Sequence, residues 1–524
     1  MKIVVRNIRL PVDSRLSDVK EQAYSRLSAV ADVSKLSGFS VCRKSVDARH
    51  REVTLVYSAL VETEETVDEK KLASVDSCIL AERDPFENIE KGVKKADGRP
   101  LVVGFGPCGM FAALSLAEQG YKPIVIERGA SVTERMFRVG RFLSTGELDC
   151  NTNIQFGAGG AGTFSDGKLV TRINDGNVRY VLEKFAELGA PAEILTEAKP
   201  HIGTDKLIKI VSNIDARIRA LGGEIRYGTC LRSINAKDGR VISVVTDDGE
   251  IKCGQLILAI GHSSRDTLSY LLSSSYTLTP KPFSVGVRIE HLREDIDKAI
   301  YGKYAGHKNL AHAEYALSYR RNDDCVYSFC MCPGGEVIAA ASEENGVVTN
   351  GMSRYARNGV NSNAALVVNV APDDPVEFQR KLERDAFRIG GGNYAAPVQT
   401  VGDFLSGKAS RSPGRITPTY MHGKTQVARI DRILPERVTE MLKTGLKVFN
   451  GRIAGFAVPD AVLTGVETRT SSPYRINRTE EMKAIGYENL YPCGEGAGYA
   501  GGITSAAVDG VEAAIQIIKE YSPD

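Results

Sequence analysis

Three glycines in the segment Leu101–Gly129 have the spacing that lets a backbone approach a phosphate group closely. An apolar strand is expected to lead directly into Gly104, Gly106 and Gly109, and a helix is expected to follow them. The first glycine permits a tight turn, the second leaves room for a pyrophosphate, and the third allows the helix to pack closely on the strand. The N-terminus of that helix then offers free N–H groups to the phosphates.

The same segment continues into a second strand that is expected to end at Glu127. A carboxylate in that position can accept hydrogen bonds from the hydroxyl groups of an adenosine ribose, and Arg128 beside it is a further candidate for cofactor binding. Because strand, glycine turn, helix, second strand and acid occur in this order, the segment predicts a dinucleotide-binding unit. The pattern alone does not distinguish NAD from FAD.

The C-terminal segment Tyr491–Ile518 favours a flavin. A strand end leads into a polar, glycine-rich loop, and an apolar helix is expected to begin near Gly502. Glu495 can bind a ribityl hydroxyl or, through water, a phosphate. The helix start would direct its dipole at the flavin N1 and C2 carbonyl, where negative charge gathers on reduction. The alternative is a helix that is only capped by a flexible loop.

Two internal segments fit the same ligand. Gln155–Arg172 concentrates glycines beside Thr163 and Asp166, and such a loop cannot pack a core but can wrap a flat polar ring with backbone N–H groups. Leu256–Ser264 is a strand that breaks at Gly261, where a βα domain places another turn that faces the cofactor.

Taken together, GFGPCG, ERG, LAIGH and CGEGAGYAGGI resemble the flavin motifs of the glutathione-reductase superfamily. A second set of segments resembles a bacterial family of uncharacterised FAD-dependent (NAD/FAD-utilising) dehydrogenases. These segments are RKSVDAR, FGAGGAGTFSDGKL, FCMCPGGEVIAAASEENGVVTNGMS and GVETRTSSPYRI. The resemblance runs from about Met1 to the C-terminus, and it implies non-covalently bound FAD, a two-part flavoprotein core and an undefined substrate.

Carried over by position, the resemblance assigns the ADP half of FAD to the first motif and the ribityl chain and flavin ring to the later ones. The residues expected to hold the ADP half are Gly104, Gly106, Gly109 and Glu127. The residues expected to border the ribityl chain and the ring are Gly160, Gly162, Thr163, Asp166, Gly494, Glu495, Gly502 and Ile503. Arg128 and Gly261 complete the cofactor-binding set. Glu495 stands where many superfamily members have Asp, so its carboxylate reaches one methylene further.

Candidates for the reacting centre lie in Gly465–Arg478, just ahead of the last flavin motif. They are Glu467, Arg469 and Arg475. Arginines in this position can bind a carboxylate substrate or stabilise negative charge on a reduced flavin. The alternative is a surface strand held by salt bridges.

Cys330 and Cys332 precede a Pro-Gly-Gly turn and are candidates for a dithiol that passes electrons to flavin. Disulfide reductases use a wider cysteine spacing on the helix after the first motif, where this chain has only Cys108. Because a C-x-C pair closes a strained disulfide ring, we favour cysteines without a redox role. His262 and His422 are candidate acids or bases, although lone histidines are more often structural.

The elements that must position these residues indicate an α/β chain with a glutathione-reductase-type, Rossmann-like FAD-binding domain. A mixed substrate domain interrupts that domain, and a small β-α-β-β domain precedes it. In chain order, the N-terminal domain, the first part of the FAD domain, the substrate domain and the C-terminal part of the FAD domain are expected at 1–97, 98–270, 271–478 and 479–524.

Hydrophobic patterns predict the individual elements of the outer segments. In the N-terminal domain they predict strands at Met1–Leu10, Gly38–Arg49 and Val53–Val61 and a helix at Asp18–Val30. In the substrate domain they predict one clear helix, Glu436–Val448. No second glycine fingerprint follows an apolar strand, since Ile389–Tyr394 (IGGGNY) lacks one. A nicotinamide would therefore visit the flavin only transiently.

Composition excludes several functions. The chain of 524 residues has a formal net charge of +2, so it has no global attraction to nucleic acid or to an anionic membrane. Its start, MKIVVRNIRLPVD, lacks a secretory signal, and no stretch approaches the roughly 18 apolar residues of a membrane helix. The 10 cysteines are scattered rather than arranged as a disulfide framework, which favours the cytoplasm.

The predicted function is an FAD-dependent oxidoreductase, a dehydrogenase. It would transfer hydride between flavin N5 and an unidentified small-molecule substrate or NAD(P)H. No metal and no membrane partner are expected, nucleic acid is disfavoured, and the oligomeric state is left open. One alternative is an RNA-modifying flavoprotein whose N-terminal domain grips RNA through the basic run Arg43–Arg51. The other is a flavin-binding sensor without turnover.

Overall fold

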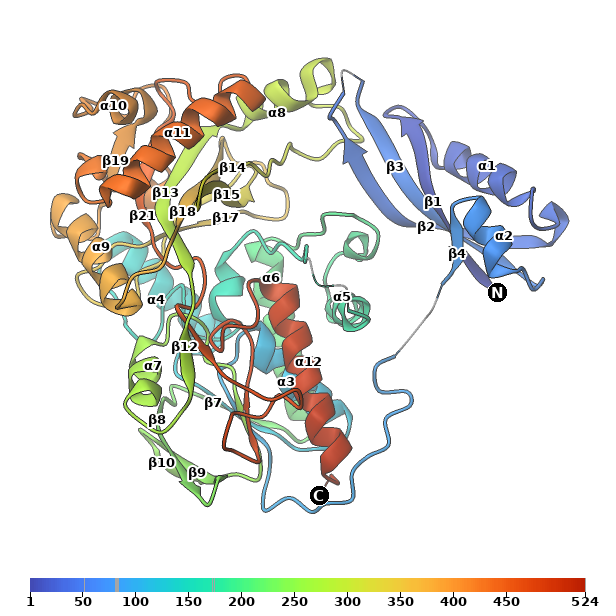
Figure 1. Cartoon of the computed structure of the whole chain (residues 1–524), viewed down its shortest axis with the longest axis horizontal. Helices are drawn as coiled ribbons and strands as arrows, with labels where there is room; N and C mark the ends of the chain where they lie inside the picture. The colour runs from blue at the N-terminus through green and yellow to red at the C-terminus, as the bar shows by residue number, and fades with distance from the viewer. Residues whose placement is uncertain (51, 81–83, 172, 174, 524) are drawn as a thin grey trace.

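The computed structural model describes residues 1–50, 52–80, 84–171, 173 and 175–523 of the chain. Arg51 and Arg172, the last residues of two segments singled out from the sequence, lie outside the described residues. The strands form a parallel sheet, a large mixed sheet, an N-terminal sheet and three smaller sheets. Figure 1 shows the mixed sheet above the parallel sheet, with the N-terminal sheet to one side of both.

A five-stranded parallel sheet carries the glycine fingerprint, with the strand order β23-β11-β5-β6-β7. Its strands are β5 (Leu101–Val103), β6 (Ile124–Glu127), β7 (Glu224–Tyr227), β11 (Leu256–Leu258) and β23 (Leu490–Pro492). Because β23 pairs in parallel with β11, the end of the chain completes a sheet that begins at Leu101. The strand order changes direction between β5 and β11, and ligands of open α/β sheets bind at such a point.

Helices cover one face of the parallel sheet, and a three-stranded meander covers the other. The helices are α3 (Pro107–Glu118), α5 (Asn177–Glu187), α6 (Thr204–Ala220) and α12 (Ile503–Glu520). The meander consists of β8 (Leu231–Lys237), β9 (Arg240–Thr246) and β10 (Gly249–Lys252). Val102 joins the helix-side core and Leu101 the meander-side core, because successive strand residues point to opposite faces. Among the helices that the structure describes, none has the length and hydrophobicity required to cross a membrane.

The mixed sheet has seven strands in the order β14-β15-β18-β13-β21-β19-β20. They are β13 (Phe283–Leu292), β14 (Ser318–Arg321), β15 (Asp324–Cys332), β18 (Asn361–Val370), β19 (Ala396–Thr400), β20 (Thr425–Val427) and β21 (Val462–Glu467). Two pairs of short strands lie outside this sheet; the first pair joins the core on the meander side of the parallel sheet, and the second contacts the mixed sheet. They are β12 (Leu278–Pro280) with β22 (Tyr474–Ile476), and β16 (Glu336–Ala339) with β17 (Thr349–Met352).

The helix predicted at Glu436–Val448 is present as α11 (Glu436–Arg452). The same region contains further helices that the sequence analysis missed. They are α8 (Arg293–Tyr301), α9 (Pro375–Ile389) and α10 (Val401–Ser406). The buried face of α9 includes Gln379 and Glu383 beside its apolar residues. These polar side chains interrupt the hydrophobic pattern that identifies a helix from sequence.

The N-terminal sheet has the order β2-β3-β1-β4. Its elements are β1 (Lys2–Pro11), α1 (Leu16–Leu27), β2 (Leu36–Asp47), β3 (Thr54–Thr63), α2 (Glu69–Ser74) and β4 (Ser77–Ile79). The expected β-α-β-β order is therefore followed by one more helix and one more strand. β4 pairs antiparallel with β1, and it is too short to show an alternating pattern in the sequence.

The N-terminal unit contacts the segment 303–310 after α8, and its strand β2 contacts the segment after α5. The Lys44 backbone N–H donates to the Thr196 carbonyl at 2.7 Å, and the Lys44 ammonium pairs with Glu197 at 3.5 Å. Arg49 donates to the buried carboxylate of Asp47. Two cations of the basic run 43–51 are thus already paired with carboxylates of this chain.

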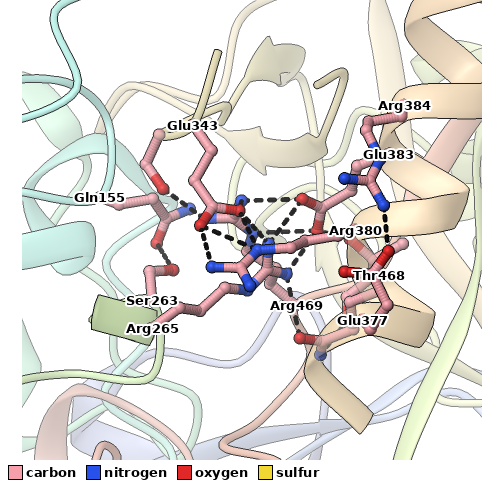
Figure 2. A network of polar contacts seen from close by, with 12 residues as sticks. Gln155, Ser263, Arg265, Glu343, Glu377, Arg380, Glu383, Arg384, Thr468 and Arg469 are labelled. Atoms are coloured by element: carbon pink, nitrogen blue, oxygen red, sulfur yellow. Dashed lines mark hydrogen bonds and ion pairs between the residues drawn. The ribbon is translucent and has the colours of Figure 1, made fainter. Parts of the chain in front are cut away.

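A buried ion network joins the two large sheets (Figure 2). Arg265, the first residue of α7 (Arg265–Leu272), donates to both carboxylate oxygens of Glu383 on α9, at 2.7 and 2.9 Å. Arg469, just after β21, donates to the same carboxylate at 2.9 and 3.1 Å. Burial raises the pKa of Glu383, but the two guanidinium groups outweigh it and hold that pKa well below its usual range. Since α7 follows β11 and α9 packs on the mixed sheet, Glu383 connects both halves.

We expect Glu383→Gln to lower the free energy of unfolding by about 3–5 kcal/mol, because it leaves two buried guanidinium groups without their shared anion. Urea unfolding followed by circular dichroism measures this. In the wild type, the contribution of Glu383 should be fully present above the unfolded-state pKa of roughly 4.3. It should fade as the pH falls below that value, since the folded-state pKa is depressed.

The matched control is Glu377→Gln on the same helix. Glu377 is half exposed and pairs with Arg384 at the surface, so its loss should cost at most about 1 kcal/mol. Equal destabilisation by the two variants would contradict a special role for the buried carboxylate.

Candidate functional site

A cavity of about 320 Å³ lies at the carboxyl ends of β5, β6, β11 and β23. These parallel strands end together at one edge of the sheet, and the mixed sheet forms the opposite wall of the cavity. The predicted site residues that line it are Gly104, Gly106, Glu127, Gly160, Gly162, Asp166, Gly261, Arg469, Glu495, Gly502 and Ile503. Folding therefore brings together three glycine-rich segments that are far apart in the sequence.

The three glycines of the first motif have different surroundings. Gly104 has φ +101°, and a Cβ there would lie 2.3 Å from the Ala259 carbonyl oxygen. A Cβ at Gly109 would lie 1.9 Å from the Gly104 carbonyl oxygen, so this glycine packs α3 on the strand and does not line the cavity. A Cβ at Gly106 would approach only the Gly160 Cα, at 3.7 Å. The missing side chain at Gly106 thus leaves space for a ligand to contact the backbone directly.

The Glu127 carboxylate accepts three backbone hydrogen bonds. The donors are the N–H groups of Phe105 at 2.8 Å, Gly129 at 2.9 Å and Gly157 at 2.9 Å. Glu127 lines the cavity, and it also ties the first turn to the glycine-rich loop; its binding of a ribose stays a prediction. Arg128 does not line this cavity but lines a smaller pocket together with Gly104 and Glu127, where it pairs with Asp266 at 2.8 Å and lies over the Phe156 ring.

Arg135 holds the glycine-rich loop in place, and the sequence analysis missed it. It lies on α4 (Val132–Thr145) and is 1% exposed. Its guanidinium donates to the backbone carbonyls of Asn153, Ile154, Gly157, Ala158 and Gly160. Burial lowers the pKa of Arg135 to about 9. An arginine on an amphipathic helix has no local feature that would reveal these distant carbonyl partners.

The side chains of Thr163 and Asp166, two other predicted residues of the glycine-rich loop, bond to groups of the protein itself. Thr163 donates to the Ala158 carbonyl at 3.1 Å and does not line the cavity. Asp166 does line it, but its buried carboxylate is paired with Arg357. Burial raises the pKa of Asp166, yet Arg357 and Lys168 outweigh it and the pKa is lowered. Lys168 reaches the cavity wall as well.

The C-terminal loop brings Glu495 to the cavity, beside His262 of the turn that follows β11. Glu495 lies 3.5 Å from Nδ1 of His262, which also lines the cavity. The other ring nitrogen of His262, Nε2, is buried and has no hydrogen-bond partner among the described residues. A buried polar atom without a partner indicates that a ligand or water belongs there. Gly494 lies behind the wall, where its N–H donates to Asp509 at 2.6 Å.

The three candidates for the reacting centre have different positions. Arg469 lines the cavity and is anchored to Glu383. Glu467 is buried behind the wall, where it pairs with Arg288 at 2.9 Å. Arg475 is exposed and lies over the Tyr499 ring, with its guanidinium carbon 5.1 Å from the ring centroid. Only Arg469 reaches the cavity.

The wall opposite the parallel sheet also contributes residues that were not in the predicted cofactor set. They are Phe329 and Cys330 of β15, Thr470 just after β21, and Asn350 of β17 in the adjoining strand pair. His422 is exposed and lies outside the cavity. Sequence patterns do not reveal this wall, because its residues come from separate segments that meet only in the folded protein.

Comparison with known proteins gives the following matches. Residues 282–470, which span the mixed sheet from β13 to just beyond β21, match the family described as "FAD-dependent protein, C-terminal domain-like". An uncharacterized protein of Clostridium beijerinckii is 45% identical over 536 residues, with 99% of each chain covered.

Among solved structures, CtdE in complex with FAD covers 80% of this chain and 83% of its own, at 10% identity and a TM-score of 0.32. Glycine oxidase from Bacillus cereus covers 80% and 95%, at 11% identity and a TM-score of 0.32. The glycerol-3-phosphate dehydrogenase from Bacillus halodurans complexed with FAD covers 81% and 65%, at 13% identity and a TM-score of 0.34. Similarity at this level carries no argument about the present chain.

Arg135→Lys should loosen the glycine-rich loop, because an ammonium group has three donors and cannot satisfy five carbonyls. The loss of at least two buried hydrogen bonds, each worth about 1 kcal/mol, should speed amide exchange in segment 153–164 by roughly tenfold or more. Hydrogen exchange with mass spectrometry measures this. Arg138→Lys on the same helix is the control, since Arg138 pairs with Glu134 at the surface. Unchanged exchange in Arg135→Lys would contradict the anchoring role.

Proposed function

The chain belongs to the same family as the Clostridium beijerinckii protein, and from this premise we propose that it is an FAD-dependent oxidoreductase. In this proposal FAD binds non-covalently in the cavity, and hydride passes between flavin N5 and a small-molecule substrate or NAD(P)H. One observation carries the proposal: the cavity joins the first glycine motif, the glycine-rich loop and the C-terminal loop at the ends of the parallel strands.

The residues present suit FAD. Both α3 and α12 begin at the cavity, at Gly106 and Gly502, and neither N-terminus has a side-chain cap. Uncapped N–H groups and positive dipole ends suit a pyrophosphate at the first helix and the electron-rich edge of a flavin at the second. The open space at Gly106 and the unpartnered Nε2 of His262 support the same fit.

We assign the ADP half to Gly104, Gly106 and Glu127, and the ribityl chain and ring to the glycine-rich loop and the C-terminal loop. The bound flavin would supply the hydride chemistry. The chain's own residues bind it, orient it and exclude water. Arg469 donates two hydrogen bonds to Glu383 and one to Ser342. Since an arginine carries five N–H donors, it keeps hydrogen-bonding capacity for an anionic group in the cavity.

The proposal extends to the domain division and the location of the protein. The parallel sheet supports a discontinuous FAD domain of the glutathione-reductase type at 98–270 and 479–524, with a substrate domain at 271–478 and an N-terminal domain at 1–97. All ten cysteines are free thiols, which supports a reducing compartment such as the cytoplasm.

We expect the purified protein to be yellow and to release FAD, not FMN, on heat denaturation. Gly106→Val should abolish flavin retention while keeping the melting temperature of flavin-free wild type, since its side chain would enter the ligand space rather than the packed core. Flavin absorbance, chromatography of the released cofactor and thermal unfolding measure the three outcomes.

Gly140→Val is the matched control for this substitution. Gly140 lies on the exposed side of α4, and a Cβ there meets nothing within 4 Å. Its variant should keep the flavin. A colourless wild type that cannot be reconstituted with FAD would refute the proposed function.

Arg469→Ala should slow substrate-dependent flavin reduction by roughly a hundredfold, the effect of losing a preorganised donor worth about 3 kcal/mol. Flavin content should change little, because Arg265 still pairs with Glu383. Stopped-flow reduction by NADH, NADPH and a panel of small acids measures the rate. Arg475→Ala, outside the cavity, is the control and should be reduced at nearly the wild-type rate. Reduction of Arg469→Ala at the wild-type rate would remove Arg469 from the reacting centre.

A further inference from the structure

We propose that Cys330 and Cys332 form a thiol–disulfide exchange site in the cavity, and that this site acts on a low-molecular-weight disulfide. The inference rests on the proposed function and deepens it, since it names the chemical class of the substrate. Cys330 lines the cavity, and Cys332 is fully buried directly behind it, with its thiol donating to the Cys330 carbonyl at 3.3 Å.

The backbone at Cys330 is shaped to expose its side chain to the cavity. The pairing of β15 with β18 shifts register between Phe329 and Cys332, which leaves a β-bulge at the cavity wall. Cys330 within this bulge has φ +45°, a left-handed conformation that a residue with a side chain rarely adopts. Bulges redirect a side chain beside functional sites, and strained residues persist where the surroundings hold them.

Charges around Cys330 favour its thiolate. The Cys332 side chain as a hydrogen-bond partner of the Cys330 sulfur is the main cause that lowers the pKa of Cys330, and it outweighs the burial that raises it. The cations Arg288 and Lys168 also lower this pKa, whereas Glu467 raises it. The pKa of Cys332 is raised well above its usual range by the same pairing. The pair thus holds one proton, with the nucleophilic sulfur at the cavity and the protonated one behind it.

Arg288 also fixes the geometry of this pair. Its buried guanidinium donates to the Cys330 carbonyl at 3.0 Å and to both oxygens of Glu467. Glu467, a candidate for the reacting centre from the sequence, is therefore a positioning residue for the arginine beside the thiol. The side-chain carbonyl of Asn350 accepts from the same guanidinium at 3.0 Å, and Asn350 lines the cavity.

The proposed thiol–disulfide exchange takes place in two steps, and its atoms and electrons balance. The Cys330 thiolate attacks one sulfur of a substrate disulfide RS–SR, forms a mixed disulfide and releases RS⁻. The Cys332 sulfur then attacks the Cys330 sulfur, forms the Cys330–Cys332 disulfide and releases a second RS⁻, while the Cys332 proton passes to a released thiolate. The substrate gains the two electrons that the two cysteines lose. Bound flavin in its reduced form would supply the two electrons that restore the dithiol.

From the sequence alone, the narrow spacing of the two cysteines favours a role without redox chemistry; in the proposed exchange site the same spacing suits turnover. A C-x-C disulfide is strained, which argues against a structural bond but makes the bond easy to reduce again. Strain in the disulfide therefore favours the return to the dithiol that each cycle requires.

A test in the full-length protein uses oxidised glutathione as the probe and Cys325→Ser as the background, since Cys325 lies on the same strand. Tandem mass spectrometry of the peptide around Cys330 reads the products. The background protein should form the Cys330–Cys332 disulfide. Adding Cys332→Ser should trap glutathione on Cys330, and adding Cys330→Ser should abolish the reaction at both positions.

A second readout needs no disulfide. In the wild type, iodoacetamide at neutral pH should alkylate Cys330 faster than Cys325 by roughly tenfold, because the thiolate is the nucleophile. This comparison takes place in one folded molecule, so a variant that fails to fold does not affect it.

The outcomes separate this inference from the proposed function. Exchange is read by mass and requires no flavin, so a colourless protein that still exchanges would refute FAD binding alone. A yellow protein in which Cys332→Ser traps no glutathione on Cys330 would overturn the exchange site alone. Equal trapping at Cys332 in the Cys330→Ser variant, or at Cys108 and Cys493 on the opposite wall, would also overturn it.

Discussion

The arrangement of the two large sheets depends on the ion pairs that the Glu383 carboxylate forms with Arg265 and Arg469. Glu383 is 2% exposed, and it accepts from guanidinium groups that belong to different halves of the molecule. A buried anion between two buried cations cannot be replaced by water, so both arginines must stay where Glu383 places them. Arg265 fixes the start of α7 after β11, and Arg469 fixes the wall of the cavity (Figure 2).

Buried charged side chains also hold the glycine-rich loop in place. A segment with so many glycines cannot hold its shape through side-chain packing, because glycine has no side chain and loses much entropy on folding. Glu127 binds the loop and the first turn through N–H groups, while Arg135 binds the loop through carbonyl groups. The backbone that faces the cavity is thus held on its other side by one buried anion and one buried cation.

The parts predicted from the sequence are those with local signals. The fingerprint Gly104, Gly106 and Gly109, the acid at the end of β6 and the helix after Gly502 follow from short-range patterns of glycine and hydrophobic residues. The missed helix α9 has a buried face that carries Gln379 and Glu383, and the missed anchor Arg135 has partners about twenty residues further along the chain. Neither has a local pattern, since their polar side chains are explained only by distant partners.

The sequence by itself determined that a glycine turn follows the strand at Leu101, that a second glycine loop precedes the last helix, and which segments carry the candidate residues. Only the tertiary structure decided that Arg469 reaches the cavity while Glu467 lies behind the wall and Arg475 lies at the surface. It alone also placed Cys330 opposite the glycine motifs. The physical reason is that a turn is specified by the conformational freedom of adjacent residues, whereas the direction of a side chain depends on sheet pairing and buried charges contributed by distant segments.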